Sequence, residues 1–165
     1  MFAGRYIHKI DEKGRIALPA KMMKAGIGLG YTEFVITKGI GGCLSIFPTN
    51  KFEEFINNFD PSYLSFEDGL NFYREFSSWA HYTSVDTQGR ILIPQILQEE
   101  SNIRDETLIL GVVDWIEVWD PKKYSEFKEK SKTDYDSGAR MFFGSLIRGK
   151  RAKNANSETS ERSDG

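Results

Sequence analysis

Two arginines in this sequence each follow an aspartate at the same short spacing. Asp11 is followed by Arg15, Asp86 is followed by Arg90, and a glycine directly precedes each arginine. The planar guanidinium of arginine can bind a phosphate or the edge of a guanine base through two parallel hydrogen bonds. The aspartate can cap a turn, and the glycine permits the bend. The pattern therefore has two interpretations, a structural corner held by an Asp–Arg pair or an outward-facing nucleic-acid contact.

Basic residues gather around the first of these turns. Lys9 and Lys13 lie beside Arg15, whereas the position that matches Lys13 in the second turn is the uncharged Gln88. We therefore expect the two turns to differ in role, with Arg15 contributing more to binding than Arg90. The predicted nucleic-acid contacts are Lys9, Lys13, Gly14, Arg15 and Arg90. The predicted structural residues of the turns are Asp11, Asp86 and Gly89.

The sequence offers little for catalysis or for metal binding. It contains two histidines, His8 and His81, and one cysteine, Cys43. A single cysteine cannot form an internal disulfide or a cysteine-rich zinc site. His81 and Asp86 could imitate an acid–base pair, but no nucleophile accompanies them. We expect no enzyme activity, no cofactor and no metal.

The net charge of the 165-residue chain is −2, but the charge is unevenly distributed. The first 24 residues contain six basic and two acidic side chains, and residues 140–153 contain five basic and no acidic ones. Residues 99–120 are mainly acidic. Folding could gather the basic stretches into one positive face, or the charges could be scattered over a solvated surface.

The composition is that of a globular protein with a substantial core. Twelve Phe, seven Tyr and three Trp supply apolar surface, which excludes a wholly disordered chain. No stretch approaches the roughly 20 apolar residues that a membrane-spanning helix requires. The first ten residues include Arg5, His8 and Lys9 and do not resemble a signal peptide. We expect a cytoplasmic protein with no membrane partner.

The Asp–Arg turn belongs to a longer internal repeat. Residues 11–19 read DEKGRIALP and residues 86–94 read DTQGRILIP, 75 positions later. Further matches follow in the same order: residues 34–36 with 108–110, 44–47 with 116–119, and 52–55 with 124–127. An ordered series of this kind indicates internal duplication.

The first half is predicted to place its turn between two short strands, followed by helices and a strand hairpin. The predicted strands are 4–10, 16–18, 33–38 and 43–47. A short helix runs from Pro19 to Ala25 and is ended by Gly26. A helix over 50–59 packs inward through Phe52, Phe55, Ile56 and Phe59. A helix over 66–79 carries an aromatic strip that is either a base-stacking surface or a core or subunit contact: Phe72, Tyr73, Phe76 and Trp79.

The second half repeats this plan. Its predicted strands are 82–85, 91–93, 108–112 and 115–119. Its predicted helices are 95–101, 121–130, with Tyr124 and Phe127 facing inward, and a helical segment over 134–146. Residues from 148 onward are polar and charged, so we expect a disordered tail.

A single half is too small to build a stable core, because apolar burial at that size barely exceeds the entropy cost of folding. We therefore predict an α+β fold, mainly β, in which strands of the two halves interleave in a pseudo-twofold barrel with peripheral helices. The predicted organisation is a first domain at 5–50, a helical connection at 51–80, a second domain at 81–124, a helical segment at 125–147 and the tail at 148–165.

The two repeats, with Met1–Tyr6 and Ile116–Pro121, give the sequence a close resemblance to the MraZ family of bacterial transcriptional regulators over residues 1–147. The resemblance implies two tandem AbrB-like swapped-hairpin domains in one chain. It implies a nucleoid-associated, ring-shaped homo-oligomer on short direct repeats in double-stranded promoter DNA. The implied target is the promoter of the division and cell-wall gene cluster, usually repressed, including the chain's own gene. The family's Asp-x-x-x-Arg motif falls on Asp11, Arg15, Asp86 and Arg90.

A second hypothesis is an AbrB-like protein-interaction module of the antitoxin type, which mainly neutralises a partner. An acidic or amphipathic disordered tail would favour it, but this tail is short and mixed in charge. An enzyme is a third hypothesis, which the missing catalytic residues disfavour.

Overall fold

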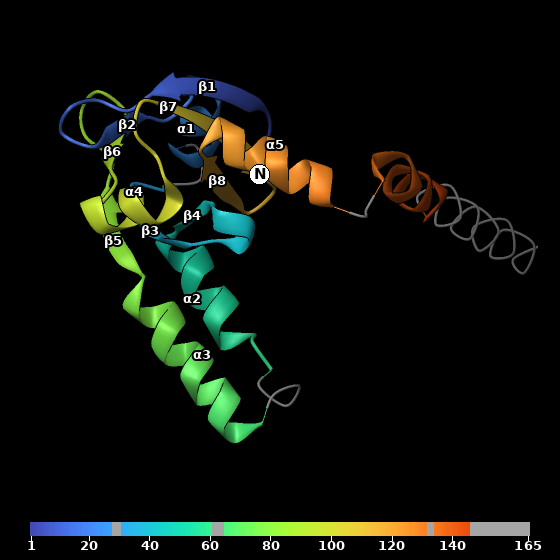
Figure 1. Ribbon diagram of the computed structural model, residues 1–165. Helices are drawn as coiled ribbons and strands as arrows, with labels where there is room; N and C mark the ends of the chain where they lie inside the picture. Colours follow the sequence, from blue (N-terminus) through green and yellow to red (C-terminus); the bar gives the residue numbers. More distant parts are fainter. Residues whose placement is uncertain (28–30, 61–64, 132–133, 146–165) are drawn as a thin grey trace, which may run out of the picture. The chain divides into compact units, whose positions relative to one another are not determined.

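The computed structural model describes residues 1–27, 31–60, 65–131 and 134–145 (Figure 1). The chain forms two compact units, Met1–Phe127 and Lys128–Gly165. The first unit contains both copies of the repeat. In the second unit, residues 135–145 are helical, in agreement with the predicted segment. The predicted disordered tail lies outside the described residues.

Two antiparallel sheets form the centre of the first unit. The larger sheet has the strand order β1-β7-β8-β4-β3-β5, and the smaller sheet pairs β2 with β6. The strands of the larger sheet are β1 (Arg5–Lys9), β3 (Glu33–Lys38), β4 (Leu44–Pro48), β5 (His81–Ser84), β7 (Glu106–Val112) and β8 (Trp115–Trp119). Those of the smaller sheet are β2 (Arg15–Ala17) and β6 (Arg90–Leu92).

The order of the large sheet is unchanged when the two halves are exchanged. Replacing β1 by β5, β3 by β7 and β4 by β8 turns the strand order into its own reverse. Three of its pairings join one half to the other: β1–β7, β4–β8 and β3–β5. The predicted interleaving and the mixed α+β class are therefore confirmed, and the closed barrel stays a prediction.

The helices lie at the positions that the sequence predicts. They are α1 (Ala20–Ile27), α2 (Thr49–Asn57), α3 (Phe66–Ser78), α4 (Gln95–Ser101) and α5 (Pro121–Lys130), with a 3₁₀ turn, η1 (Ile40–Gly42), between β3 and β4. Of these, α4 and α5 have the predicted bounds, and the ends of the other three α-helices differ by one or two residues. The prediction that Gly26 ends the first helix is wrong, because α1 continues to Ile27. A glycine costs a helix only about 1 kcal/mol relative to alanine and does not by itself stop it. Within the described ranges, none of the helices has the length and apolar character needed to cross a membrane.

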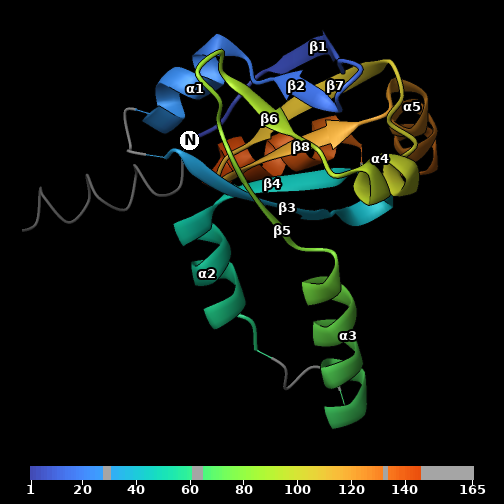
Figure 2. The same ribbon diagram turned by 90° about the vertical axis from the view of Figure 1, so that its left-hand side faces the viewer.

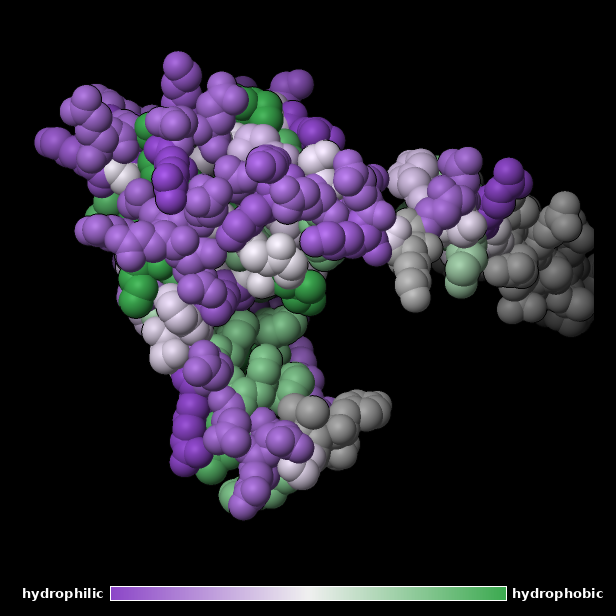
Figure 3. All heavy atoms as spheres, viewed as in Figure 1, coloured by the Kyte–Doolittle hydropathy of each residue, from purple (hydrophilic) through white to green (hydrophobic). Residues whose placement is uncertain are grey.

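Helices α2 and α3 lie side by side as a hairpin between β4 and β5 (Figures 1 and 2). Phe52 of α2 is buried and stacks on Phe76 of α3 with 5.7 Å between ring centroids. Phe55 contacts Phe47 and Phe76, with ring centroids 5.7 and 6.2 Å apart, but stays 47% exposed, so the predicted inward packing holds only in part for this residue. Figure 3 shows hydrophobic residues gathered on this hairpin. The aromatic strip of α3 thus packs partly against α2, because one hairpin is too small to enclose all of its rings.

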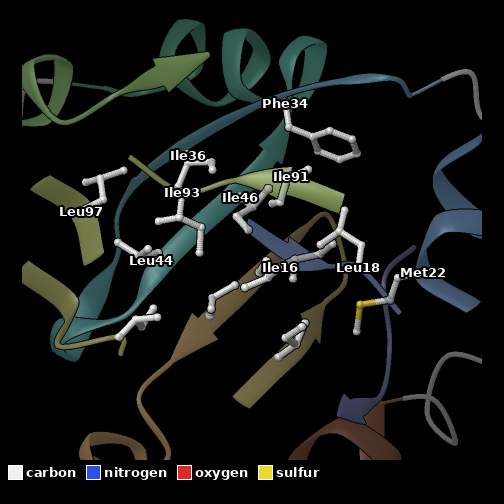
Figure 4. Packing of buried hydrophobic residues seen from close by; sticks show 14 of the residues in the cluster. Ile16, Leu18, Met22, Phe34, Ile36, Leu44, Ile46, Ile91, Ile93 and Leu97 are labelled. Atoms are coloured by element: carbon white, nitrogen blue, oxygen red, sulfur yellow. The ribbon is translucent and has the colours of Figure 1, made fainter. Parts of the chain in front are cut away.

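The small sheet is anchored to the core through one isoleucine from each copy of the repeat. Ile16 and Ile91 are paired across β2 and β6 and are 0% and 1% exposed. They pack with two equivalent pairs, Leu18 with Ile93 and Met22 with Leu97, and with Leu44 and Ile46 of β4, all shown in Figure 4. Since side chains alternate along a strand, the neighbouring residues Arg15 and Arg90 lie on the face opposite the core.

Candidate nucleic-acid interface

The first turn, between β1 and β2, is closed by Asp11. Its amide donates a hydrogen bond to the carbonyl of Arg15, and its carbonyl accepts one from the amide of Gly14, each at 2.9 Å. Its Oδ1 accepts from the amides of Lys13 at 3.0 Å and Arg15 at 2.9 Å. Gly14 has φ of +76°, in the left-handed region that glycine tolerates best. Aspartate and glycine are therefore both required by the shape of this turn.

The guanidinium of Arg15 is held by the second oxygen of the same carboxylate. Nε donates to Oδ2 of Asp11 at 2.8 Å, and Nη2 lies 2.7 Å from that oxygen. The hydrogen bond from the Arg15 side chain is the largest cause that lowers the pKa of Asp11 from 3.8 to about 2. A guanidinium carries five N–H donors, so this pairing leaves donors for a further acceptor. The Arg15 side chain is 29% exposed, and water or a ligand can reach it.

The second turn, between β5 and β6, reproduces this geometry. Oδ1 of Asp86 accepts from the amides of Gln88 and Arg90, each at 2.9 Å. Nε of Arg90 donates to Oδ2 of Asp86 at 2.8 Å, and Gly89 again has φ of +76°. The same side-chain hydrogen bond lowers the pKa of Asp86 below its usual range. The predicted structural corner and the predicted ligand-facing arginine are thus compatible, since one carboxylate orients the guanidinium and leaves part of it exposed.

The two turns form one continuous surface. In the β2–β6 pairing, Arg15 lies opposite Leu92, and Arg90 lies opposite Ala17, so both arginines are on the face away from the core. Nη1 of Arg90 is 3.7 Å from Oδ2 of Asp11, which brings the two Asp–Arg pairs together. We call residues 11–15 and 86–90 the paired-turn surface; the antiparallel register places its two turns at opposite ends of the β2–β6 pair, as Figure 2 shows.

Each turn is tied to the other copy of the repeat. The amide of Leu18 donates to the carbonyl of Gly89 at 3.0 Å, and the amide of Ile93 donates to the carbonyl of Gly14 at 2.8 Å. These two bonds are equivalent under the exchange of the halves. They place the helix that follows each motif beside the turn of the other motif. The paired-turn surface is therefore built jointly by both repeats.

The other predicted contact residues lie around the first turn. Lys13 is exposed and lines a groove together with Gln98 and Glu99 of α4. Lys9 is exposed at the end of β1 and lines a neighbouring groove. Gly14 is buried below the side chain of Gln98, so its contribution is the shape of the turn.

Arg104 and Gln98 were not singled out from the sequence. Arg104 lines the grooves that contain Lys9 and Lys13 and adds a positive charge to this side of the surface. Nε2 of Gln98 donates to the carbonyl of Ile93 at 2.7 Å, next to the first turn. At the equivalent position of the first repeat stands Met23, so the repeat alignment marks Gln98 as a residue in which the two copies differ.

His8 and Cys43, which could suggest catalysis or metal binding, have surroundings that indicate a structural role. Nδ1 of His8 is 2.5 Å from the carbonyl oxygen of Ala17 and ties β1 to β2 as a donor. Burial raises the pKa of the Cys43 thiol to about 12, so the thiol stays protonated and unreactive at neutral pH. Among the described residues no cluster of three or more histidine, cysteine or acidic side chains could hold a metal ion.

Comparison with known proteins relates this chain to a family. The family model described as "MraZ protein, putative antitoxin-like" matches residues 1–69 and 76–142. A protein of Finegoldia magna named "Transcriptional regulator MraZ" is 38% identical over 136 residues, which cover 82% of this chain and 92% of that protein. The protein of the same name from Clostridium beijerinckii is 40% identical over 137 residues, covering 83% and 93% of the two chains. That of Heliobacterium modesticaldum is 34% identical over 139 residues, covering 84% and 94%.

Proposed function

This chain belongs to the MraZ family, and from that premise we propose that it regulates transcription by binding double-stranded DNA through its paired-turn surface. Its relatives are named as transcriptional regulators, and it is accordingly not an enzyme. The observation that carries the proposal is the pair of adjacent, partly exposed guanidinium groups on the face opposite the core. Both are held in place before a ligand arrives, which lowers the entropy cost of binding.

The surroundings of the arginines support a DNA site. Phosphates receive half to two-thirds of the hydrogen bonds in protein–DNA interfaces, and arginine suits either a phosphate or a guanine edge. Lys13 and Lys9 would add phosphate contacts beside Arg15. Since each turn is short, one chain makes few contacts, and affinity requires several chains on adjacent sites.

The finer parts of the proposal rest on the family resemblance. We propose a ring-shaped homo-oligomer that binds short direct repeats in the promoter of the division and cell-wall gene cluster, including the chain's own gene. Occupation of that promoter would repress transcription. We place this activity in the cytoplasm, on the nucleoid.

The test is a binding titration with the full-length chain and a fluorescent duplex from the region upstream of its own gene. A shuffled duplex of equal length measures non-specific binding. We expect Arg15→Ala to weaken specific binding by roughly 5- to 150-fold, since one bidentate base contact contributes about 1–3 kcal/mol. The ion pair with Asp11 is partly exposed and adds little to stability, so the variant should stay folded.

Arg74→Ala on α3 is the matched control. Arg74 is an exposed arginine away from the turns, with a hydrogen bond to Asn71 at 3.1 Å. Its replacement should leave DNA affinity unchanged. Wild-type affinity in Arg15→Ala would refute the proposal. A stoichiometric protein partner that co-purifies with a chain unable to bind DNA would favour the interaction-module hypothesis instead.

A further inference from the structure

The helices that follow the two motifs are equivalent in backbone and opposite in charge. α1 and α4 each begin after a proline, and the carbonyls of Pro19 and Pro94 accept the same two amide hydrogen bonds from the first turn of the helix. With the repeats aligned at 75 positions, Lys21 of α1 corresponds to Ile96, and Lys24 corresponds to Glu99. The next residue of α4, Glu100, is a second acid, where α1 has Ala25.

The swapped packing puts each helix beside the turn of the other repeat. For α4 this is directly visible, because residues 11–14 line one groove with Gln95, Gln98 and Glu99. The equivalent residues of α1 are Ala20, Met23 and Lys24. Since the hydrogen bonds that tie each motif to the opposite turn are equivalent, we expect Lys24 to lie on the side of α1 that faces residues 86–89.

The two ends of the paired-turn surface consequently differ in charge. At the first end, Lys13 and Arg104 are balanced by Glu12 and Glu99, and Lys9 in the neighbouring groove is balanced by Asp105. Glu99 also accepts a hydrogen bond from Nε2 of Gln95 at 2.8 Å. At the second end, Thr87 and Gln88 are neutral, and Lys21 and Lys24 are exposed on α1. The acids one strand further away, Glu33 and Glu106, are equivalent in the two halves and do not change the comparison.

We propose that Lys21 and Lys24 are phosphate contacts of the DNA site and that they fix one orientation of the chain on DNA. This inference rests on the proposed function. A surface with true twofold symmetry would fit its site equally well after a half-turn. Here the half-turn would place Glu99 where Lys24 meets a phosphate, and two like charges in contact disfavour that orientation. Neighbouring chains would therefore bind their sites in the same direction.

The first experiment measures the salt dependence of binding. The full-length chain and Lys21→Ala/Lys24→Ala are titrated against the duplex from upstream of the chain's own gene over a range of salt concentrations. Each phosphate contact contributes about 0.9 to the slope of log K against log salt, so the double variant should lose roughly 1.8 per bound chain. The matched control is Lys51→Ala/Arg74→Ala on α2 and α3, which removes the same charge and should leave the slope unchanged.

The outcomes separate the two proposals. If Arg15→Ala loses affinity but Lys21→Ala/Lys24→Ala keeps the wild-type slope, the inference is overturned and the proposed function stands. If the wild-type chain does not prefer the promoter duplex, the proposed function fails and the inference falls with it. A reduced slope in the lysine variant, with an unchanged control, supports the inference.

The second experiment reads the orientation directly. Thr87→Cys places a reactive thiol in the exposed second turn, where an iron–EDTA reagent can be attached. Cys43 does not compete, because it is buried and its pKa is raised to about 12. On a duplex with one binding site, the reagent should cleave on one side of the site. Equal cleavage on both sides would overturn the single orientation. Lys24→Glu/Glu99→Lys, which exchanges the charges of the two ends, should shift cleavage toward the opposite side.

Discussion

The two turns of the paired-turn surface have the same internal geometry and different surroundings. In both turns the aspartate accepts hydrogen bonds from two backbone amides and from the arginine side chain, and the glycine has φ of +76°. Around them the copies diverge, since Gln98 covers Gly14 whereas nothing lies within 4 Å of a Cβ added at Gly89. The aspartate, glycine and arginine that the copies share build the turn. The neighbouring residues that differ do not build it, so they can differ in function between the copies.

The arginines show a further difference between the turns. Arg90 lies near two carboxylates, that of Asp86 at 2.7 Å and that of Asp11 at 3.7 Å. In the described part of the chain no matching ion pair joins Arg15 to Asp86. The charge of Arg90 is thus more fully offset than that of Arg15. Substitutions at equivalent positions of the two turns can therefore separate their shared role in building the fold from their different roles in binding.

The largest expected effect is on stability, from substitution of the core isoleucine that each copy of the repeat contributes. Ile16→Ala and Ile91→Ala each remove a fully buried side chain at the centre of the small sheet. Each should lower the free energy of unfolding by about 2–5 kcal/mol, since truncation of a core isoleucine leaves a cavity. The two values should agree closely, because the residues are paired across β2 and β6. Urea unfolding measures both, and a large difference between them would break the equivalence of the halves.

The next effect concerns binding and distinguishes the arginines. Arg15→Ala should reduce affinity for the promoter duplex more than Arg90→Ala does. For Arg90→Ala we expect a loss on the order of fivefold, at the lower end of the range for one bidentate contact. The reason is that Arg90 is already offset by two acids, and the second end retains Lys21 and Lys24. Fluorescence anisotropy at fixed salt tests this order, and the reverse order would contradict it.

Substitution of the glycines should have a smaller effect, on stability. Gly14→Ala and Gly89→Ala both force alanine into the left-handed region, at roughly 1–2 kcal/mol. Gly14→Ala should cost more, because its Cβ would also meet Nε2 of Gln98 and lie 3.2 Å from the carbonyl oxygen of Ile93. Thermal unfolding compares the two variants. Adding Gln98→Ala should bring Gly14→Ala closer to Gly89→Ala, and no change on that addition would argue against the steric cause.

The smallest expected effect is the pH response of the turns. Because the pKa of Asp11 falls from 3.8 to about 2 on folding, its contribution to stability is fully present above 3.8 and is lost as the pH falls toward 2. Asp86 is shifted in the same direction. NMR titration of the carboxyl carbons measures the pKa of each aspartate. In Arg15→Ala, the pKa of Asp11 should return toward 3.8, whereas the pKa of Asp86 should stay below its usual range. Titration of Asp11 near 3.8 in the wild-type chain would contradict the pairing.

The sequence predicts best those features that depend on local chemistry. The bounds of α4 and α5 and the two Asp–Gly–Arg turns follow from prolines, an aspartate cap and the hydrophobic period. The prediction failed at Gly26, which lies inside α1, and in part at Phe55, which stays 47% exposed although its ring lies 5.7 Å from that of Phe47. Both outcomes depend on tertiary context, which local patterns do not contain.

The candidate site was predicted in part. Each Asp–Arg pair was expected, but their juxtaposition through Arg90 and Asp11 depends on the register of β2 against β6, which spacing alone does not give. The opposite charges of α1 and α4 were already present in the aligned repeats. Which helix lies beside which turn depends on the hydrogen bonds between Leu18 and Gly89 and between Ile93 and Gly14, which the sequence alone does not give.

The interleaved strand order also has a consequence for how the chain is made. β1 pairs with β7, and the hydroxyl of Thr107 donates to the carbonyl of His8, about 100 residues earlier. At a synthesis rate of 5–20 residues per second, the first strand emerges from the ribosome roughly 5–20 s before its partner exists. During that interval the nascent first half exposes unpaired strand edges. It is then open to pairing with the first half of a neighbouring nascent chain on the same messenger RNA, and a chaperone that shields those edges would raise the yield of folded protein.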